Sequence, residues 1–155
     1  MATKPIPDGY TSVTPYLYVR RSSDAIEFYK KAFGATEILR LTMPGDGIAH
    51  AEIQIGNARI MLADEMPEWG NKGPQTLGGV SCGFAIYVLD CDAAFAKAVA
   101  CGATVHRPLA DQFYGDRSGT VIDPFGHSWT LCTHLKDMTE AEMQTAMDEW
   151  MKTQG

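Results

Sequence analysis

Residues 24–36, DAIEFYKKAFGAT, decide the fold, because residues 92–104, DAAFAKAVACGAT, repeat their beginning and their end. Each stretch opens with Asp-Ala and reaches Gly-Ala-Thr ten residues later. The residues between place apolar side chains at helical spacing, which predicts two helices of equal length. Asp24 and Asp92 are expected to cap the helix starts, and the glycine of each Gly-Ala-Thr to end the helix in a left-handed conformation. The chain therefore contains an internal repeat.

Segments typical of strands surround both predicted helices. Residues 13–19 precede the first helix and residues 84–88 precede the second, both with alternating apolar and polar side chains. Three further strand-like segments follow each helix, at 36–42, 48–55 and 58–63 in the first half and at 104–107, 119–122 and 128–134 in the second. This order predicts an α+β protein with tandem βαβββ modules, whose strands form a curled mixed sheet around a concave pocket.

We expect one domain over residues 1–155, with its first module at about 10–65 and its second at about 81–135. The glycine- and proline-containing segment at about 66–80 is interpreted as a linker. Thr139-Glu-Ala-Glu142 is a capping box and predicts a C-terminal helix at about 139–152. Methionines and Trp150 give that helix an apolar face, which either packs on its own sheet, contacts a second subunit or covers a pocket.

Composition and charge exclude several classes of protein. The 155 residues are 45% hydrophobic and 21% charged, which is typical of a globular chain with a core. The net charge of −6 repels phosphate backbones, so we expect no nucleic-acid partner. No apolar run is long enough to cross a bilayer, and the first residues do not resemble a signal peptide. We therefore expect no membrane partner. The four cysteines form no CxxC pair, so we expect free thiols and a cytoplasmic location.

Strand alternation assigns polar side chains to one face of each sheet. Ala51 and Ile53 point to the core, so His50 and Glu52 point to the opposite face. With His127 and His134 they suggest a metal site; alternatively, His50 and Glu52 form a hydrogen-bonded pair in a pocket or on the surface, and we favour this second interpretation. Arg117, which follows two aromatic residues, either holds a ligand or braces a loop through an ion pair.

Two motifs carry a family resemblance. Residues 25–37, AIEFYKKAFGATE, and residues 123–129, DPFGHSW, resemble the vicinal oxygen chelate superfamily of glyoxalase I, bleomycin-resistance proteins and extradiol dioxygenases. Residues 50–56, 61–65 and 112–117 resemble its uncharacterised bacterial subgroup that is named after a phosphonate-operon protein. The resemblance covers residues 10–135 and implies the βαβββ fold and a homodimer.

Enzymes of that superfamily bind a divalent metal through His or Glu side chains at four positions. Matched by motif, these positions fall on Thr14, Met61, Gly83 and Thr130. None of the four provides an ordinary His or carboxylate ligand. The resemblance therefore implies no metal site and no cofactor, and it disfavours the glyoxalase, dioxygenase and transferase reactions that need the metal.

The expected function is metal-independent binding of a small molecule, which the protein would sequester as the bleomycin-resistance branch does. The alternative is a lyase or isomerase that uses acid–base chemistry, or an unconventional metal site, around His50 and Glu52. A third class is a structural or regulatory protein that acts through its C-terminal helix. The predicted ligand-binding residues, with Trp69 as a lid, are Tyr16, His50, Glu52, Arg59, Trp69, Phe113, Tyr114 and Arg117.

Overall fold

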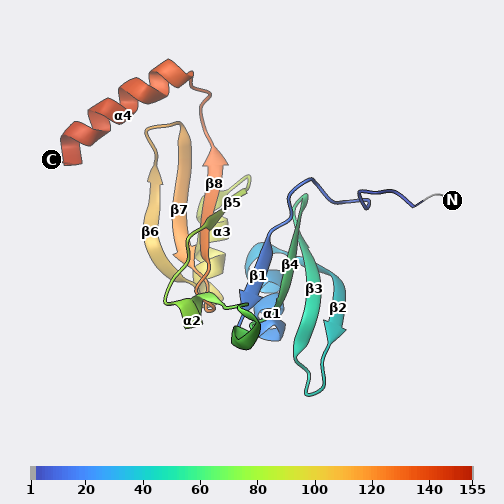
Figure 1. Cartoon of the computed structure of the whole chain (residues 1–155). Helices are drawn as coiled ribbons and strands as arrows, with labels where there is room; N and C mark the ends of the chain where they lie inside the picture. Colours follow the sequence, from blue (N-terminus) through green and yellow to red (C-terminus); the bar gives the residue numbers. More distant parts are fainter. Residues whose placement is uncertain (1–2, 155) are drawn as a thin grey trace. The chain divides into compact units, whose positions relative to one another are not determined.

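The computed structural model describes residues 3–154, which form two compact units (Figure 1). The first unit contains residues 3–81 and the short segment 124–127. The second contains residues 82–123 and 128–154. Each unit holds one four-stranded sheet.

The first unit is a βαβββ module followed by two short helices. Its elements are β1 (Tyr16–Val19), α1 (Ser22–Phe33), β2 (Thr36–Thr42), β3 (Ile48–Ile55), β4 (Ala58–Asp64), η1 (Pro67–Trp69) and α2 (Pro74–Leu77). The strand order is β1-β4-β3-β2, with β1 parallel to β4 and the other pairs antiparallel. Because a parallel pair needs a long connection, the chain must complete the α1 crossover and two more strands before β1 gains its partner.

The second unit repeats this topology. Its elements are β5 (Gly83–Tyr87), α3 (Cys91–Ala100), β6 (Thr104–Asp111), β7 (Asp116–Ile122), β8 (Ser128–His134) and α4 (Glu140–Gln154). The strand order is β5-β8-β7-β6, again with the first strand parallel to the last. Tyr16 pairs with Met61 and Gly83 with Ser128, both 45 positions apart. The α+β class, the tandem modules and the C-terminal helix are confirmed, with the strands in two open sheets; a curled sheet around a pocket stays a prediction.

The core of the first unit lies between α1 and one face of its sheet (Figure 1). Ala51 and Ile53 on β3 are fully buried, as the alternation predicted, and so is Tyr29 on α1, the helix that contacts β3. Burial of each large apolar side chain contributes about 1.5–3 kcal/mol. The turn 124–127 also belongs to this unit, and its Phe125 ring lies edge-on to the rings of Phe28 and Tyr29 at 6.3 and 6.5 Å.

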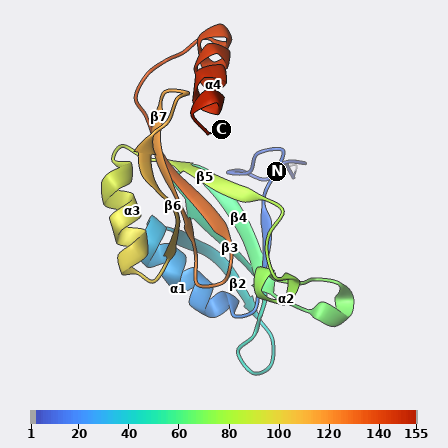
Figure 2. The ribbon, with the colours of Figure 1, turned by 90° about the vertical axis from the view of Figure 1, so that its left-hand side faces the viewer.

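In the second unit α3 lies along one face of the sheet (Figure 2). Trp129 on β8 is almost fully buried, and its indole N–H donates to Asp123 Oδ2 at 2.9 Å. Gly119 on β7 faces α3, and a Cβ atom there would lie 2.7 Å from Phe95 Cε2. The close contact of helix and sheet therefore requires glycine at this position.

The helix starts differ from the prediction. α1 begins at Ser22, and the Ser22 N–H donates to Asp64 Oδ1 at 2.7 Å, so the capping carboxylate comes from the end of β4, 42 residues later. Asp24 lies in the first turn and pairs with Arg21. In α3 the N-cap is Asp90, which accepts from the Ala93 N–H, so the predicted cap at Asp92 was wrong by two residues. The left-handed end of α1 at Gly34 is confirmed.

The linker and the C-terminal helix have different attachments. Directly after β4, Glu65 accepts hydrogen bonds from the Thr76 hydroxyl and the Gly73 N–H, which lower its pKa and tie the linker to the end of this strand. At the start of α4, Thr139 and Glu142 form the predicted reciprocal capping box. α4 extends beyond β8 and has no buried residue (Figure 2).

Within residues 3–154, no helix is long and apolar enough to span a membrane.

Candidate functional site

The polar face of the first sheet gathers chemically active side chains from three neighbouring strands. Tyr16 on β1 and Glu52 on β3 are both register partners of Met61 on β4, so the three side chains form one row across the sheet. His50 precedes Glu52 by two residues and therefore points to the same face. The alternation predicted from the sequence thus places Tyr16, His50 and Glu52 together.

A chain of hydrogen bonds joins these residues. Tyr16 Oη lies 2.8 Å from His50 Nδ1, and His50 Nε2 lies 3.2 Å from Glu52 Oε1. Because a carboxylate only accepts hydrogen bonds, Nε2 carries the ring proton and Nδ1 accepts from the Tyr16 hydroxyl. Glu52 is 8% exposed and Tyr16 is 41% exposed. The series of hydrogen bonds therefore runs from a buried carboxylate to a more exposed tyrosine.

The second oxygen of Glu52 is also engaged. The Tyr10 hydroxyl donates to Oε2, and Arg59 Nη1 lies 3.6 Å from the same atom. The Arg59 guanidinium lies over the Tyr10 ring, 4.8 Å from its centre, where the negative ring face attracts it. Gly9 permits this arrangement, because a Cβ atom there would lie 2.8 Å from Arg59 Nη2. The buried charge of Glu52 is thus surrounded by the donors that it needs.

Sequence reasoning missed Tyr10. It lies in the segment before β1, which has neither helical nor strand periodicity, so nothing marked its side chain as facing the sheet. The one local signal is Gly9, whose φ of 84° shows a backbone turn that brings the chain toward Arg59. A tyrosine directly after such a turn is a weak signal by itself.

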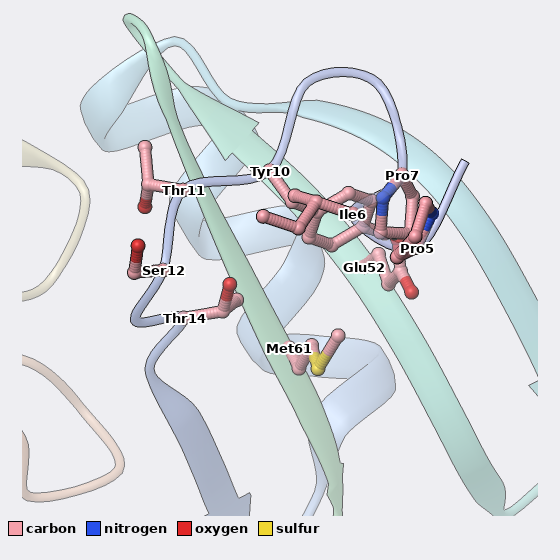
Figure 3. Close-up of a pocket in the computed structure, with 9 residues that line it drawn as sticks. All are labelled: Pro5, Ile6, Pro7, Tyr10, Thr11, Ser12, Thr14, Glu52 and Met61. Carbon is pink, nitrogen blue, oxygen red and sulfur yellow. The ribbon is translucent and has the colours of Figure 1, made fainter.

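Above Glu52 the same segment forms the wall of a cavity of about 570 Å³ (Figure 3). The lining residues are Pro5, Ile6, Pro7, Tyr10, Thr11, Ser12, Thr14, Glu52 and Met61. Figure 3 shows Pro5, Ile6, Pro7 and Tyr10 gathered beside Glu52. Its volume and its mixture of apolar walls and few polar groups are typical of small-molecule sites.

A second, smaller cavity of about 250 Å³ lies beside Tyr16. Its walls include Tyr18, Met66 and Trp69, and Trp69 is 73% exposed. Burial and the neighbouring Tyr18 raise the pKa of Tyr16 above its ordinary value. Trp69 thus shares a cavity with Tyr16, while its role as a lid stays a prediction.

The remaining predicted site residues lie in the second unit. Phe113 packs against Tyr114 and against Trp150 of α4, at ring distances of 5.2 and 5.8 Å. Arg117 forms ion pairs with Asp92 at 2.7 Å and Asp111 at 2.9 Å, which raise its own pKa and lower that of Asp92. These contacts join α3, β6 and β7, which is what the loop-bracing alternative requires. Ligand roles for Phe113, Tyr114 and Arg117 stay predictions.

The second unit also has a polar network that sequence reasoning did not find. Asp116 is 5% exposed and accepts from the Tyr87 hydroxyl and from His134 Nδ1, both at 2.7 Å. His134 Nε2 lies 3.0 Å from Asp137 Oδ1. The hydrogen bond to Asp116 raises the pKa of Tyr87 to about 12, and the two carboxylates raise the pKa of His134. Tyr87, Asp116 and His134 are far apart in sequence, so no local motif indicated this network.

The four positions that the resemblance matches to the superfamily's metal ligands hold no imidazole or carboxylate group in this chain. Thr14 and Met61 line the larger cavity, Gly83 has no side chain, and the Thr130 hydroxyl shares a hydrogen bond with Thr120 at 2.9 Å. Divalent metals in such sites are bound by imidazole or carboxylate groups, and these four residues have neither. Within residues 3–154, no three His, Cys, Asp or Glu side chains are grouped to hold a metal ion.

Comparison with known proteins identifies relatives across most of the chain. Residues 10–131 match the model of the glyoxalase/bleomycin resistance protein/dioxygenase superfamily. The uncharacterised protein Rv0887c of Mycobacterium tuberculosis (strain ATCC 25618 / H37Rv) is 40% identical over 139 residues, which cover 88% of this chain and 82% of that protein. The uncharacterised protein Mb0911c of Mycobacterium bovis is equally similar, over 88% of this chain and 91% of that protein.

Solved structures share the fold. TioX from Micromonospora sp. ML1 has a TM-score of 0.60 at 27% identity, over 83% of this chain and 100% of TioX. A gene product from Arabidopsis thaliana has a TM-score of 0.64 at 28% identity, over 79% of this chain and 98% of that one. A Bacillus cereus structure described as a putative 3-demethylubiquinone-9 3-methyltransferase, PhnB protein, has a TM-score of 0.63, over 79% of this chain and 99% of that chain. At 16% identity it supports the fold alone.

Proposed function

The chain belongs to the glyoxalase/bleomycin resistance protein/dioxygenase superfamily, and from that premise we propose that it binds a small molecule on the polar face of its first sheet without a metal ion. The observation that carries this proposal is the buried Glu52 carboxylate beneath a cavity of about 570 Å³. A buried carboxylate beside apolar walls provides orientation, and the walls provide contact area. His50 and Arg59 complete the polar groups of the proposed site.

The charge of the site favours a particular ligand class. Glu52 is negative, the whole chain carries −6, and Arg59 is the single full positive charge in contact with Glu52 among the described residues. An anionic ligand would meet repulsion from the carboxylate and from the net charge. We therefore expect neutral or cationic amphipathic molecules to bind in preference to anions.

Three naphthyl compounds of matched size test this proposal. Naphthylmethylamine, naphthylmethanol and naphthoate differ mainly in charge, and their binding is measured by calorimetry or by tyrosine fluorescence. We expect the amine to bind roughly tenfold more tightly than the carboxylate, a difference of about 1.4 kcal/mol. Glu52→Gln should remove this preference, and His50→Ala and Arg59→Ala should weaken binding of all three.

Exposed residues of the second unit provide matched controls. Glu140→Gln, His106→Ala and Arg107→Ala make the same chemical changes at exposed positions and should leave binding unchanged. The proposal fails if no compound binds saturably, or if the site variants bind as the controls do. Elemental analysis of protein incubated with zinc, nickel, manganese and ferrous iron tests metal independence, and near-stoichiometric retention would contradict it.

The hydrogen-bonded chain Tyr16–His50–Glu52 favours a second candidate, an enzyme that acts by acid–base chemistry at the same site. His50 accepts from a hydroxyl through one ring nitrogen and is held by a carboxylate through the other, as catalytic bases are. Recovery of a bound ligand separates the two candidates. A sequestering protein returns the ligand intact, whereas a lyase or isomerase returns a product.

A further inference from the structure

Tyr16, His50 and Glu52 stand in the order that an activated nucleophile requires. The signature is a hydroxyl within hydrogen-bond reach of a base, with the base oriented by a third group. Here the hydroxyl-to-base distance is 2.8 Å and the base-to-carboxylate distance is 3.2 Å. Glu52 is the buried member and Tyr16 is 41% exposed and lines a cavity, so a substrate can approach the tyrosine end of the three residues.

We propose that Tyr16 is the nucleophile of an acyl-transfer reaction that hydrolyses small aryl esters. The proposal rests on the proposed function, because it uses the same hydrogen-bonded residues Tyr16, His50 and Glu52, but it places the ester in the neighbouring cavity of about 250 Å³ beside Tyr16. It adds a reaction that ligand binding does not require. Tyr16 and His50 would be catalytic residues, because they contact the reacting atoms. Glu52 would be a positioning residue that acts through His50.

The reaction has two balanced stages. Tyr16 Oη attacks the ester carbonyl carbon and forms a new C–O bond, while its proton passes to His50 Nδ1; the bond to the aryloxy group breaks, and that group leaves with the proton from His50. Water then attacks the acyl carbon and gives its proton to His50, the bond to Tyr16 breaks, and the phenolate recovers the proton. The sum is ester plus water giving a carboxylic acid and a phenol. Glu52 holds the Nε2 proton and stabilises the imidazolium formed at each stage.

Aryl esters suit a tyrosine nucleophile, because the group that leaves and the group that attacks are both phenols of similar basicity. Burial and Tyr18 raise the pKa of Tyr16, so little phenolate exists at neutral pH and the attack needs a base. His50 provides that base at hydrogen-bonding distance. A nitrophenyl ester, whose leaving group is a weaker base than tyrosine, is therefore a favourable substrate for the first stage.

The cavity beside Tyr16 limits the acyl group. Its volume of about 250 Å³ is smaller than typical sites for drug-sized ligands. Tyr18, Ala49, Ala63 and Met66 make much of its wall apolar. Short, uncharged acyl groups fit this volume and chemistry, so acetyl and propionyl esters should react faster than long-chain esters.

The test follows nitrophenolate release from p-nitrophenyl acetate by the full-length protein. His50→Ala should lower kcat/KM roughly 100-fold, the usual size of an acid–base contribution, and Tyr16→Phe, which removes the nucleophile, should lower it at least as much. Tyr87→Phe and His106→Ala, which change the same residue types in the second unit, should keep the wild-type rate. Mass spectrometry of protein quenched during turnover should locate the acetyl group on Tyr16, and this measurement needs no variant to fold.

Glu52 is tested separately because it acts through His50. Glu52→Gln keeps the shape of the side chain and should lower kcat roughly 100-fold while KM stays within about twofold, since the carboxylate does not touch the ester. Glu52→Asp restores the charge and should recover part of kcat. A purely structural role would instead lower the unfolding midpoint and change KM and kcat together.

The outcomes separate this proposal from the binding proposal. Acetylation of lysines alone, or an unchanged rate in Tyr16→Phe, overturns the nucleophile. Binding of the naphthyl compounds without ester hydrolysis overturns the acyl transfer and leaves the proposed function standing. Neither binding nor hydrolysis overturns both.

Discussion

The two modules have the same topology and similar residue types in their polar networks, but the order of those residues differs. In the first module His50 lies between Tyr16 and Glu52. In the second, Asp116 lies between Tyr87 and His134. A histidine in the middle can accept a proton on one side and be held on the other, whereas a carboxylate in the middle fixes both neighbours as donors. The first network is therefore suited to proton transfer and the second to holding side chains in place.

The modules also differ in how their helices begin. In the first, both oxygens of Asp64 are used, one by the Ser22 N–H and one by the Ile48 N–H. In the second, the Thr133 hydroxyl accepts from the Cys91 N–H and donates to the Val88 carbonyl. One position at the end of the last strand thus performs the same task with a charged group in one module and a neutral group in the other.

The largest expected effect tests this difference in capping. Asp64→Ala removes an ionised acceptor from two backbone N–H groups and should lower the free energy of unfolding by about 3 kcal/mol. Thr133→Ala removes a neutral hydroxyl and should cost about 1 kcal/mol. Urea denaturation measures both, and equal losses would show that charge does not distinguish the two caps.

The next effect concerns Tyr87. Its pKa of about 12 depends first on the hydrogen bond to Asp116, so Asp116→Asn should move it back toward the ordinary value of about 10. Ultraviolet absorbance of tyrosinate during an alkaline titration measures this shift. Glu52→Gln, the matching change in the first module, should leave Tyr87 unaffected. A Tyr87 pKa that does not fall in Asp116→Asn would remove the carboxylate from the centre of the second network.

A smaller effect concerns the pH dependence of His134. Asp116 and then Asp137 raise its pKa above 6.5 in the folded protein, so the stabilising charge is fully present below 6.5 and is lost as the pH rises through the raised value. We expect the midpoint temperature of thermal unfolding to fall as the pH rises through this window, starting near neutral pH. Asp137→Asn should narrow the window, because one of the two partners is removed. Proton NMR of the His134 ring follows its titration directly, and a pKa at or below 6.5 in that titration would contradict the prediction.

The smallest effect is expected at Tyr16. Tyr16 is 41% exposed, so water can replace its hydroxyl on His50, and Tyr16→Phe should change the free energy of unfolding by less than about 1 kcal/mol. Urea denaturation beside the ester assay would then show that any loss of activity is not a loss of folding. A larger destabilisation would make the first network structural, as we take the second to be.

Much of the fold could be predicted because both copies of the repeat show the local spacing of apolar residues that is typical of helices and strands. The strand-helix-strand order and the buried faces at Ala51 and Ile53 follow from periodicity alone. The helix caps could not be predicted, because Asp64 reaches Ser22 from another strand and Asp90 is only one of two suitable residues near the start of α3. Local motifs compete with such tertiary contacts, and the sequence does not show which prevails.

The part of the candidate site that lies on strands could be predicted, whereas the part in the segment before β1 could not. Tyr16, His50, Glu52 and Arg59 were found through strand alternation, and the structure joins them through Glu52 and His50. Tyr10 was missed because its segment has no regular structure. For Arg117 the sequence left a ligand role and an ion pair open, since the positions of Asp92 and Asp111 relative to it depend on how α3 and β6 pack.

The ring of Phe125 has a consequence for synthesis. It packs on Phe28 and Tyr29 of the first unit, yet it is encoded in the turn between β7 and β8. When the ribosome has synthesised the chain only as far as β4, the aromatic cluster of the first module therefore still lacks one ring. That ring arrives only after β7 has been made, so the first half of the chain reaches its final packing late in translation.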